Sequence, residues 1–410
     1  MKTVAVLGTF DTKGKELKFI KECIEEQGLK TLCINTGVFE SVVEPDISSA
    51  EVAAAVGADI NAIVEKRDRA TATEVLAKGT EKLIPQLYAE GKFDGIISIG
   101  GSGGTSLATP AMRQLPLGVP KVMVSTMASG DVSPYVGTSD IVMIPSVVDA
   151  EGLNDISKVI FSNAANAIVG MVQNRKEIES DGNPLLAATM FGVTTPCVKA
   201  AEDYLHEQGY DVLVFHATGT GGKCMEALID QGFIKGVLDL TTTEWCDEVV
   251  GGVLNAGPDR LTAAGKNGIP QVVSVGALDM VNFGPMDTVP AQFKDRNLYK
   301  HNPTVTLMRT TADELKSIGH EIATRLADAT GKTTLMLPLK GVSMIDVEGQ
   351  PFYDAEADKV LFDTLRTELA DSNVEIVELD TDINDKEFAV AAAKETHFPL
   401  LQEESEKSDL

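Results

Sequence analysis

Residues 95–105 read Gly95-Ile96-Ile97-Ser98-Ile99-Gly100-Gly101-Ser102-Gly103-Gly104-Thr105. The apolar first half is typical of a buried β-strand, and the glycine-rich second half is typical of the turn that leads from a strand into a helix. Glycine-rich backbone can approach a ligand closely, and the N–H groups at the start of the next helix favour a negative charge. This stretch therefore predicts a strand–helix unit whose loop binds phosphate or another anion; a plain flexible turn is the alternative.

The same order of strand and helix repeats along the chain. Short apolar runs, for example residues 4–7, 29–34 and 271–275, alternate with segments that have helical spacing of apolar residues. Strands that are joined by helices favour parallel sheets. We therefore predict an α/β protein with mainly parallel sheets.

A polar stretch at residues 173–184 ends in turn-forming residues and predicts a domain boundary. We expect an N-terminal subdomain over residues 1–180, a C-terminal subdomain over residues 184–400 and an acidic flexible tail over residues 401–410. Each half begins with a strand, a loop with Gly and Thr, a helix that ends in Glu-Gln-Gly, and a second strand that ends in Thr-Gly. This predicts two Rossmann-like subdomains that arose by duplication, unless the likeness is one that any two such units share.

Composition narrows the possible functions. The chain has 410 residues, 43% of them hydrophobic and 23% charged, with a formal net charge of −26. A surface this acidic repels nucleic acid and anionic lipid. No apolar run approaches the roughly 18 residues that a membrane helix needs, and the N-terminus is too quickly polar for a secretory signal. We expect a cytoplasmic protein that binds neither nucleic acid nor membrane, with reduced and mostly buried cysteines.

The first turn of the chain, residues 8–15, is predicted to lie beside the glycine-rich loop. Lys13 and Lys15 would supply positive charge there. Either Asp11 or Thr12 is the N-cap of the next helix, or Asp11 is a ligand for Mg²⁺ or a hydroxyl group. The loop at residues 125–130 could complete the pocket. The predicted cofactor-binding residues are Gly8, Thr9, Asp11, Thr12, Lys13, Thr36, Gly37, Gly100, Gly101, Ser102, Gly103, Gly104, Thr105, Thr126 and Met127.

Neither common nucleotide fingerprint is present. The first turn lacks the Gly-x-Gly-x-x-Gly pattern of dinucleotide-binding folds. Residues 217–224 lie on the P-loop template but have Ala217 and Cys224 where Gly and Ser or Thr are required. This second glycine-rich turn, with Lys223 at the start of a helix, could still hold a carboxylate or phosphate.

Polar residues gather at the ends of strands in the second half. If the topology brings them to one rim, they suit acid–base work on a carbonyl or carboxylate substrate. For each residue alone, an ordinary surface or core role is the alternative. The predicted catalytic residues are His216, Lys223, Glu244, Asp279, His301 and Arg309.

Three segments together resemble a known family: residues 8–13, residues 100–105 and residues 215–223. They are similar to the bacterial homologues of the ATP-binding inhibitory domain of the tomato mosaic virus resistance protein, over about residues 1 to 400. The resemblance implies two Rossmann-like subdomains, ATP binding in the first, and dimers or larger homo-oligomers. It also implies a role in small-molecule metabolism; the antiviral role of the plant relative is not carried over.

These observations lead to three hypotheses. The first is an ATP-binding metabolic enzyme, a transferase, kinase or ligase-like protein, which holds ATP with Mg²⁺ and acts on a small acidic or carbonyl substrate, for example by phosphoryl transfer. The second is a nucleotide-responsive oligomeric binding module without turnover. The third is a lyase or hydrolase in the C-terminal half with a regulatory N-terminal half.

Overall fold

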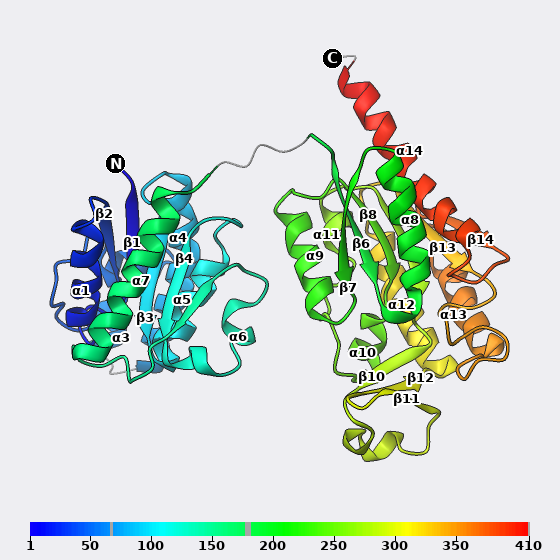
Figure 1. Cartoon of the computed structure of the whole chain (residues 1–410), viewed down its shortest axis with the longest axis horizontal. Helices are drawn as coiled ribbons and strands as arrows, with labels where there is room; N and C mark the ends of the chain where they lie inside the picture. The colour runs from blue at the N-terminus through cyan, green and yellow to red at the C-terminus, as the bar shows by residue number, and fades with distance from the viewer. Residues whose placement is uncertain (66–68, 177–181, 409–410) are drawn as a thin grey trace. The chain divides into compact units, whose positions relative to one another are not determined.

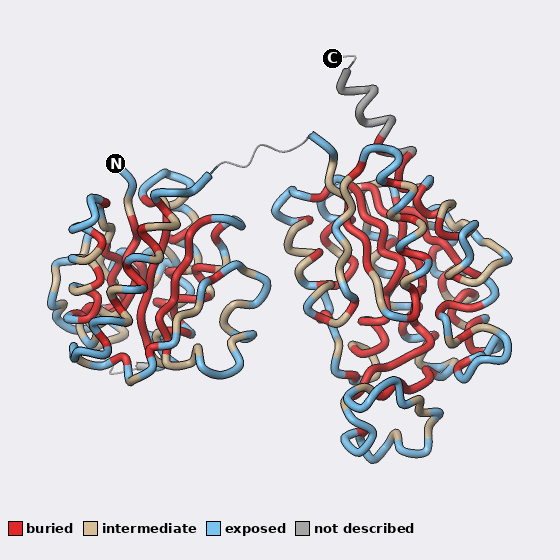
Figure 2. Tube along the Cα trace, in the orientation of Figure 1, coloured by how far each residue is buried: buried red, intermediate tan, exposed pale blue. Residues whose placement is uncertain are grey.

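The computed structural model describes residues 1–65, 69–176 and 182–408. The chain divides into two compact units, Met1–Glu179 and Ser180–Leu410, each with its own sheet and buried interior (Figures 1 and 2). These are unit 1 and unit 2.

Unit 1 is built on a five-stranded sheet whose strands are all parallel. The strand order is β2-β1-β3-β4-β5, so the chain reverses direction across the sheet between β1 and β3. The bounds are β1 Thr3–Gly8, β2 Lys30–Asn35, β3 Gly95–Gly100, β4 Lys121–Ser125 and β5 Val142–Pro145.

Helices cover both faces of this sheet, because successive strand side chains point to opposite faces. Val4 and Val6 pack with α1 and α7, while Ala5 and Leu7 pack with α2, α4 and α5. The helices of unit 1 are α1 Gly14–Glu25, α2 Ser49–Ala54, α3 Ile60–Glu65, α4 Arg69–Ala89, α5 Ser102–Arg113, α6 Ser133–Val136 and α7 Asp155–Gln173.

Unit 2 contains a six-stranded parallel sheet of order β14-β13-β9-β8-β6-β7. Its neighbouring strands β7-β6-β8-β9 correspond to β2-β1-β3-β4 of unit 1, so the first four strands of each unit have the same order. The bounds are β6 Leu185–Met190, β7 Asp211–His216, β8 Gly236–Thr241, β9 Gln271–Gly276, β13 Thr333–Pro338 and β14 Glu375–Leu379. The two halves thus share a strand order as well as the sequence pattern described above.

A small antiparallel sheet is inserted between β9 and β13. Its strands are β10 Met280–Phe283, β11 Leu298–Asn302 and β12 Val305–Arg309. The helices of unit 2 are α8 Thr195–Glu207, α9 Thr220–Asp230, α10 Glu244–Val250, α11 Ala263–Lys266, α12 Ala312–Ala327, α13 Ala355–Glu368 and α14 Lys386–Ser408.

The predicted fold class, two Rossmann-like α/β subdomains with mainly parallel sheets, is confirmed. The backbone is helical as far as Ser408, and residues 409–410 lie outside the described residues. The flexible acidic tail over residues 401–410 stays a prediction. None of the described helices is both long and apolar enough to span a membrane.

Candidate functional site

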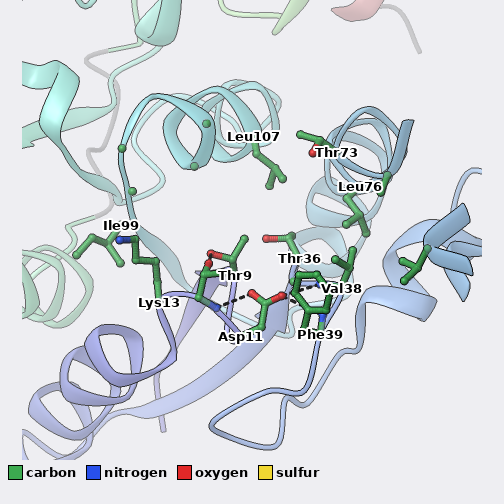
Figure 3. Close-up of a pocket in the computed structure, with 18 residues that line it drawn as sticks. Thr9, Asp11, Lys13, Thr36, Val38, Phe39, Thr73, Leu76, Ile99 and Leu107 are labelled. Carbon is green, nitrogen blue, oxygen red and sulfur yellow. Dashed lines mark hydrogen bonds between the residues drawn. The ribbon is translucent and has the colours of Figure 1, made fainter. Parts of the chain in front are cut away.

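A cavity of about 650 Å³ opens at the carboxyl ends of β1, β2 and β3 (Figure 3). It lies where the strand order of unit 1 reverses, which is the place at which open α/β sheets bind ligands. The residues that line it are Thr9, Asp11, Thr12, Lys13, Thr36, Gly37, Val38, Phe39, Val64, Ala72, Thr73, Leu76, Ile99, Gly100, Gly101, Gly103, Gly104 and Leu107.

The glycine-rich loop presents free backbone N–H groups to this cavity. Gly101 is the N-cap of α5 and has no side chain to cap the helix, and the first intrahelical bond runs from Thr105 N–H to Gly101 C=O at 2.9 Å. A Cβ on Gly103 would meet no atom within 4 Å, so the backbone there faces open space. A Cβ on Gly100 would instead crowd the backbone of Gly104. The loop therefore needs glycine for its shape and leaves the N-terminus of a 12-residue helix open to an anion.

The first turn adds two hydroxyl groups and a cation. The Thr12 hydroxyl donates to the Thr9 hydroxyl at 2.9 Å. Lys13 is half-buried, and its ammonium group makes no hydrogen bond or ion pair with any residue that the structure describes. Figure 3 shows the Lys13 side chain on the same side of the cavity as Ile99, where β3 runs into the glycine-rich loop. Positive charge and free N–H groups thus share one end of the cavity.

Asp11 positions the loop that follows β2. Its carboxylate accepts hydrogen bonds from the N–H groups of Val38 and Phe39 at 2.9 and 3.0 Å, and from Thr12 N–H at 2.6 Å. The N-cap interpretation of Asp11 is wrong, because the N-cap of α1 is Lys13 and no side chain caps that helix. A Cβ on Gly37 would overlap the Asp11 carboxylate, so glycine is required there.

The other end of the cavity is apolar. Its wall combines the loop after β2 with side chains of α3, α4 and α5: Val38, Phe39, Val64, Ala72, Leu76 and Leu107. Phe39 is 71% exposed although it lines the cavity, which leaves an aromatic ring available at the mouth. Sequence reasoning missed these residues; Phe39 follows the Thr-Gly that ends the second strand, and this position was the signal that could have shown it.

Thr36 lies between the two ends. Thr36 is only 3% exposed, and its N–H donates to Gly8 C=O at 2.9 Å. Its hydroxyl has no hydrogen-bond partner among the described residues. In Figure 3 the labelled Thr36 stands between Thr9 and Val38. Leaving a buried hydroxyl without a partner costs about 1–3 kcal/mol, and a ligand in the cavity that Thr36 lines is a candidate for that partner.

The remaining residues predicted for this site do not line the cavity. Thr105 is buried behind the glycine-rich loop, where its hydroxyl bonds Gly101 C=O at 2.7 Å and the Ser125 hydroxyl at 2.6 Å. It thereby ties the loop to the end of β4. The others lie at the end of β1, at the exposed start of α5 and in the turn after β4: Gly8, Ser102, Thr126 and Met127.

In unit 2, Glu244 fills the second glycine-rich turn from within. Its buried carboxylate accepts hydrogen bonds from Gly219 N–H at 2.7 Å and Gly222 N–H at 3.1 Å, and from Arg260 at 2.7 Å. Arg260 also pairs with Asp239. The position that was expected to hold a bound carboxylate or phosphate is therefore occupied by the protein's own carboxylate.

Arg309 and Asp279 belong to another buried group. Arg309 binds Asp358 at 2.6 Å and Asp346 at 3.2 Å. One Asp279 oxygen accepts from the Ser343 hydroxyl at 2.8 Å, and the other has no partner among the described residues. Burial raises the pKa of Asp279 to about 7, although the charge of Arg309 opposes this.

Neither of the two cavities described here brings the six predicted catalytic residues together. A second cavity, of about 540 Å³, is lined by Arg309 and by none of the other five. His216 and Lys223 are exposed near the second glycine-rich turn, and His301 is exposed on β11 in the inserted sheet. β11 and β12, which carry His301 and Arg309, belong to the inserted antiparallel sheet and not to the parallel sheet, so these two residues do not lie at the ends of the parallel strands.

These features place the chain in the class of doubly wound α/β proteins with two Rossmann-like subdomains and a cavity at the strand-order reversal of the first. The chain belongs to the uncharacterised protein family UPF0261, whose N-terminal domain model matches residues 2–177 and whose C-terminal domain model matches residues 183–398.

Relatives align over nearly the whole chain. A UPF0261 protein of Clostridium tetani is 57% identical over 96% of this chain and 98% of its own length. The tomato (Solanum lycopersicum) ToMV resistance protein Tm-1 is 42% identical over 95% of this chain, which spans about half (54%) of that protein. The family resemblance is thereby confirmed. The solved structure of a Methanocaldococcus jannaschii UDP-GlcNAc 2-epimerase covers 97% of this chain and 92% of its own with a TM-score of 0.22 and 9% identity, too little to carry a functional argument.

Proposed function

We propose that unit 1 binds a nucleotide, and specifically ATP. The observation that carries the proposal is a single cavity with two chemically different ends. The open N-terminus of α5, Lys13 and two threonine hydroxyls suit a chain of phosphates, and the apolar wall with Phe39 suits a base. The family resemblance, which implies ATP binding in the first subdomain, agrees with this.

The Mg²⁺ that accompanies ATP would arrive with the nucleotide. Mg²⁺ is usually held by phosphate oxygens, water and one or two carboxylates. Asp11 is the carboxylate among the residues that line the cavity, and its oxygens already accept three backbone hydrogen bonds. We therefore assign Asp11 the role of shaping the site, and we expect phosphates and water to supply most of the metal's ligands.

The arrangement in unit 2 favours a nucleotide-responsive binding protein over an ATP-consuming enzyme. Glu244 is engaged with Arg260, and Arg309 with Asp358. Acid–base catalysis needs groups that reach a substrate together, and these residues are committed to separate internal networks. Incubation of the protein with ATP and a panel of sugar acids tests this choice: release of ADP with any of them would favour the enzyme.

Titration calorimetry with ATP and Mg²⁺ tests the binding site through Gly103→Asp. The new carboxylate would stand in open space at the start of α5 and repel the phosphates, so ATP affinity should fall more than about tenfold. Gly170→Asp in α7 is a matched control, because it also faces open space on a helix and does not line the cavity. Unchanged affinity in Gly103→Asp would rule out this phosphate site.

A further inference from the structure

The unpartnered hydroxyl of Thr36 has a specific place in the proposed site. Thr36 follows directly on β2, which pairs with β1, and its N–H is held by Gly8 C=O at the end of β1. The backbone at this position is therefore fixed. In dinucleotide-binding folds, a residue near the end of the second strand hydrogen-bonds the ribose, and the phosphates lie at the N-terminus of the helix after the first strand. In this chain the open helix N-terminus is that of α5, which follows β3, and β3 lies on the other side of β1 from β2.

Neighbouring polar groups leave this hydroxyl to a ligand. The Asn35 side chain accepts from Phe10 N–H at 3.1 Å and from Gly37 N–H at 2.8 Å, and donates to Ser41 at 3.0 Å. The Asp11 carboxylate is occupied by the backbone of the loop after β2. The side chains of Asn35 and Asp11 are thus bonded elsewhere, while Thr36 lines the cavity and its buried hydroxyl lacks a partner among the described residues.

We propose that the Thr36 hydroxyl hydrogen-bonds a ribose hydroxyl of the nucleotide, so that the site binds a nucleotide that lacks this hydroxyl more weakly. This rests on the proposed function of unit 1. Thr36 lies between the phosphate end at Thr9 and the apolar end at Val38, which is the order of phosphate, sugar and base along a nucleotide (Figure 3). A ribose hydroxyl both donates and accepts, as the threonine hydroxyl does, so the pair is complementary.

The test measures the binding of ATP, 2′-deoxy-ATP and 3′-deoxy-ATP to the full chain by calorimetry. The wild-type protein should bind ATP about tenfold more tightly than at least one of the two deoxy analogues. Thr36→Val keeps the shape of the side chain and removes the hydroxyl. The Thr36→Val variant should bind ATP about as weakly as the wild-type protein binds the discriminated deoxy analogue. The affinity of the variant for that analogue should differ little from the wild-type value.

Two further variants separate recognition from folding. Thr36→Ser restores a hydroxyl and should recover much of the discrimination. Thr12→Val removes a hydroxyl from the phosphate end and should leave the ratio between ATP and the deoxy analogue unchanged. Equal affinity of the wild-type protein for all three nucleotides, or a ratio that persists in Thr36→Val, would overturn the role of Thr36 alone. If the wild-type protein binds none of the three, the proposed function fails with it.

Discussion

At the scale of single residues, buried polar groups in this chain fall into two kinds. Glu244 and Arg260 satisfy each other and the nearby backbone N–H groups, so they stabilise unit 2 locally. Thr36 and Asp279 each have a buried oxygen without a partner among the described residues. Thr36 faces a cavity, whereas Asp279 is enclosed in the interior, and we expect this difference to separate ligand recognition from pH-dependent stability.

Asp279 should make unit 2 less stable as the pH rises. Its pKa is raised from 3.8 to about 7 by burial, so the folded protein keeps a proton that the unfolded chain releases above about pH 4. Stability should therefore fall between about pH 4 and pH 7, and this group should add no further loss above that range. Urea unfolding should show a shallower decline for Asp279→Asn than for the wild-type protein.

An acid outside the interior supplies the control for that comparison. Asp287 is exposed and lies near the same inserted sheet, so Asp287→Asn should keep the wild-type pH dependence. If Asp279→Asn declines as steeply as the wild-type protein, a proton on Asp279 is not the cause.

At the scale of elements, the turn from β3 into α5 shows how two glycines in one loop differ. A Cβ at Gly100 would lie 2.8 Å from Gly104 Cα, while a Cβ at Gly103 would meet nothing within 4 Å. Gly100→Ala should lower the free energy of unfolding by about 1–3 kcal/mol, because backbone must shift to make room. Gly103→Ala should cost nothing and could stabilise α5 by up to about 1 kcal/mol. Urea unfolding of the two variants measures the difference, and equal values would contradict it.

Much of unit 1 could be predicted from the sequence because its signals are local. An apolar run followed by glycines indicates a strand and a strand-to-helix turn, and residues 95–105 form this in the structure. The polar end of the cavity could be predicted as well, because the carboxyl ends of parallel strands meet at one edge of the sheet and bring the first turn beside the glycine-rich loop. The helical part of the apolar end could not be predicted, because Leu76 and Leu107 are ordinary core residues by spacing and only the packing of α4 and α5 turns them toward the cavity.

Unit 2 was harder to predict because its site candidates depend on topology. Glu244 was expected to act on a substrate. Its partner Arg260 is 16 residues away and lies in no recognisable motif, so the ion pair between them could not be predicted from the sequence. His301 and Arg309 lie on strands of an antiparallel insertion, which sequence spacing alone does not distinguish from the parallel strands around it.

At the scale of the whole molecule, net charge should shape how an anionic nucleotide arrives. The chain carries a formal charge of −26, so its long-range field opposes ATP even though the cavity presents Lys13. Raising the ionic strength from about 10 mM to about 150 mM shortens the screening length from about 30 Å to about 8 Å. The association rate of ATP should then rise several-fold in stopped-flow measurements.

Adenosine provides the uncharged comparison in the same experiment, and its association rate should change little with salt. A rate for ATP that falls as salt is added would show that local attraction at Lys13 outweighs the field of the molecule as a whole.

The carboxylate of Glu244 also bears on how many nucleotides one polypeptide can carry. Both units have a turn rich in glycine after a parallel strand, and in the second unit an internal side chain already sits against the N–H groups of that turn. A phosphate could bind there only by displacing the Glu244 carboxylate, which is part of the protein and is neutralised by the buried guanidinium group of Arg260. If unit 1 binds a nucleotide as proposed, we therefore expect one nucleotide per chain, because the matching turn in unit 2 is already occupied by Glu244.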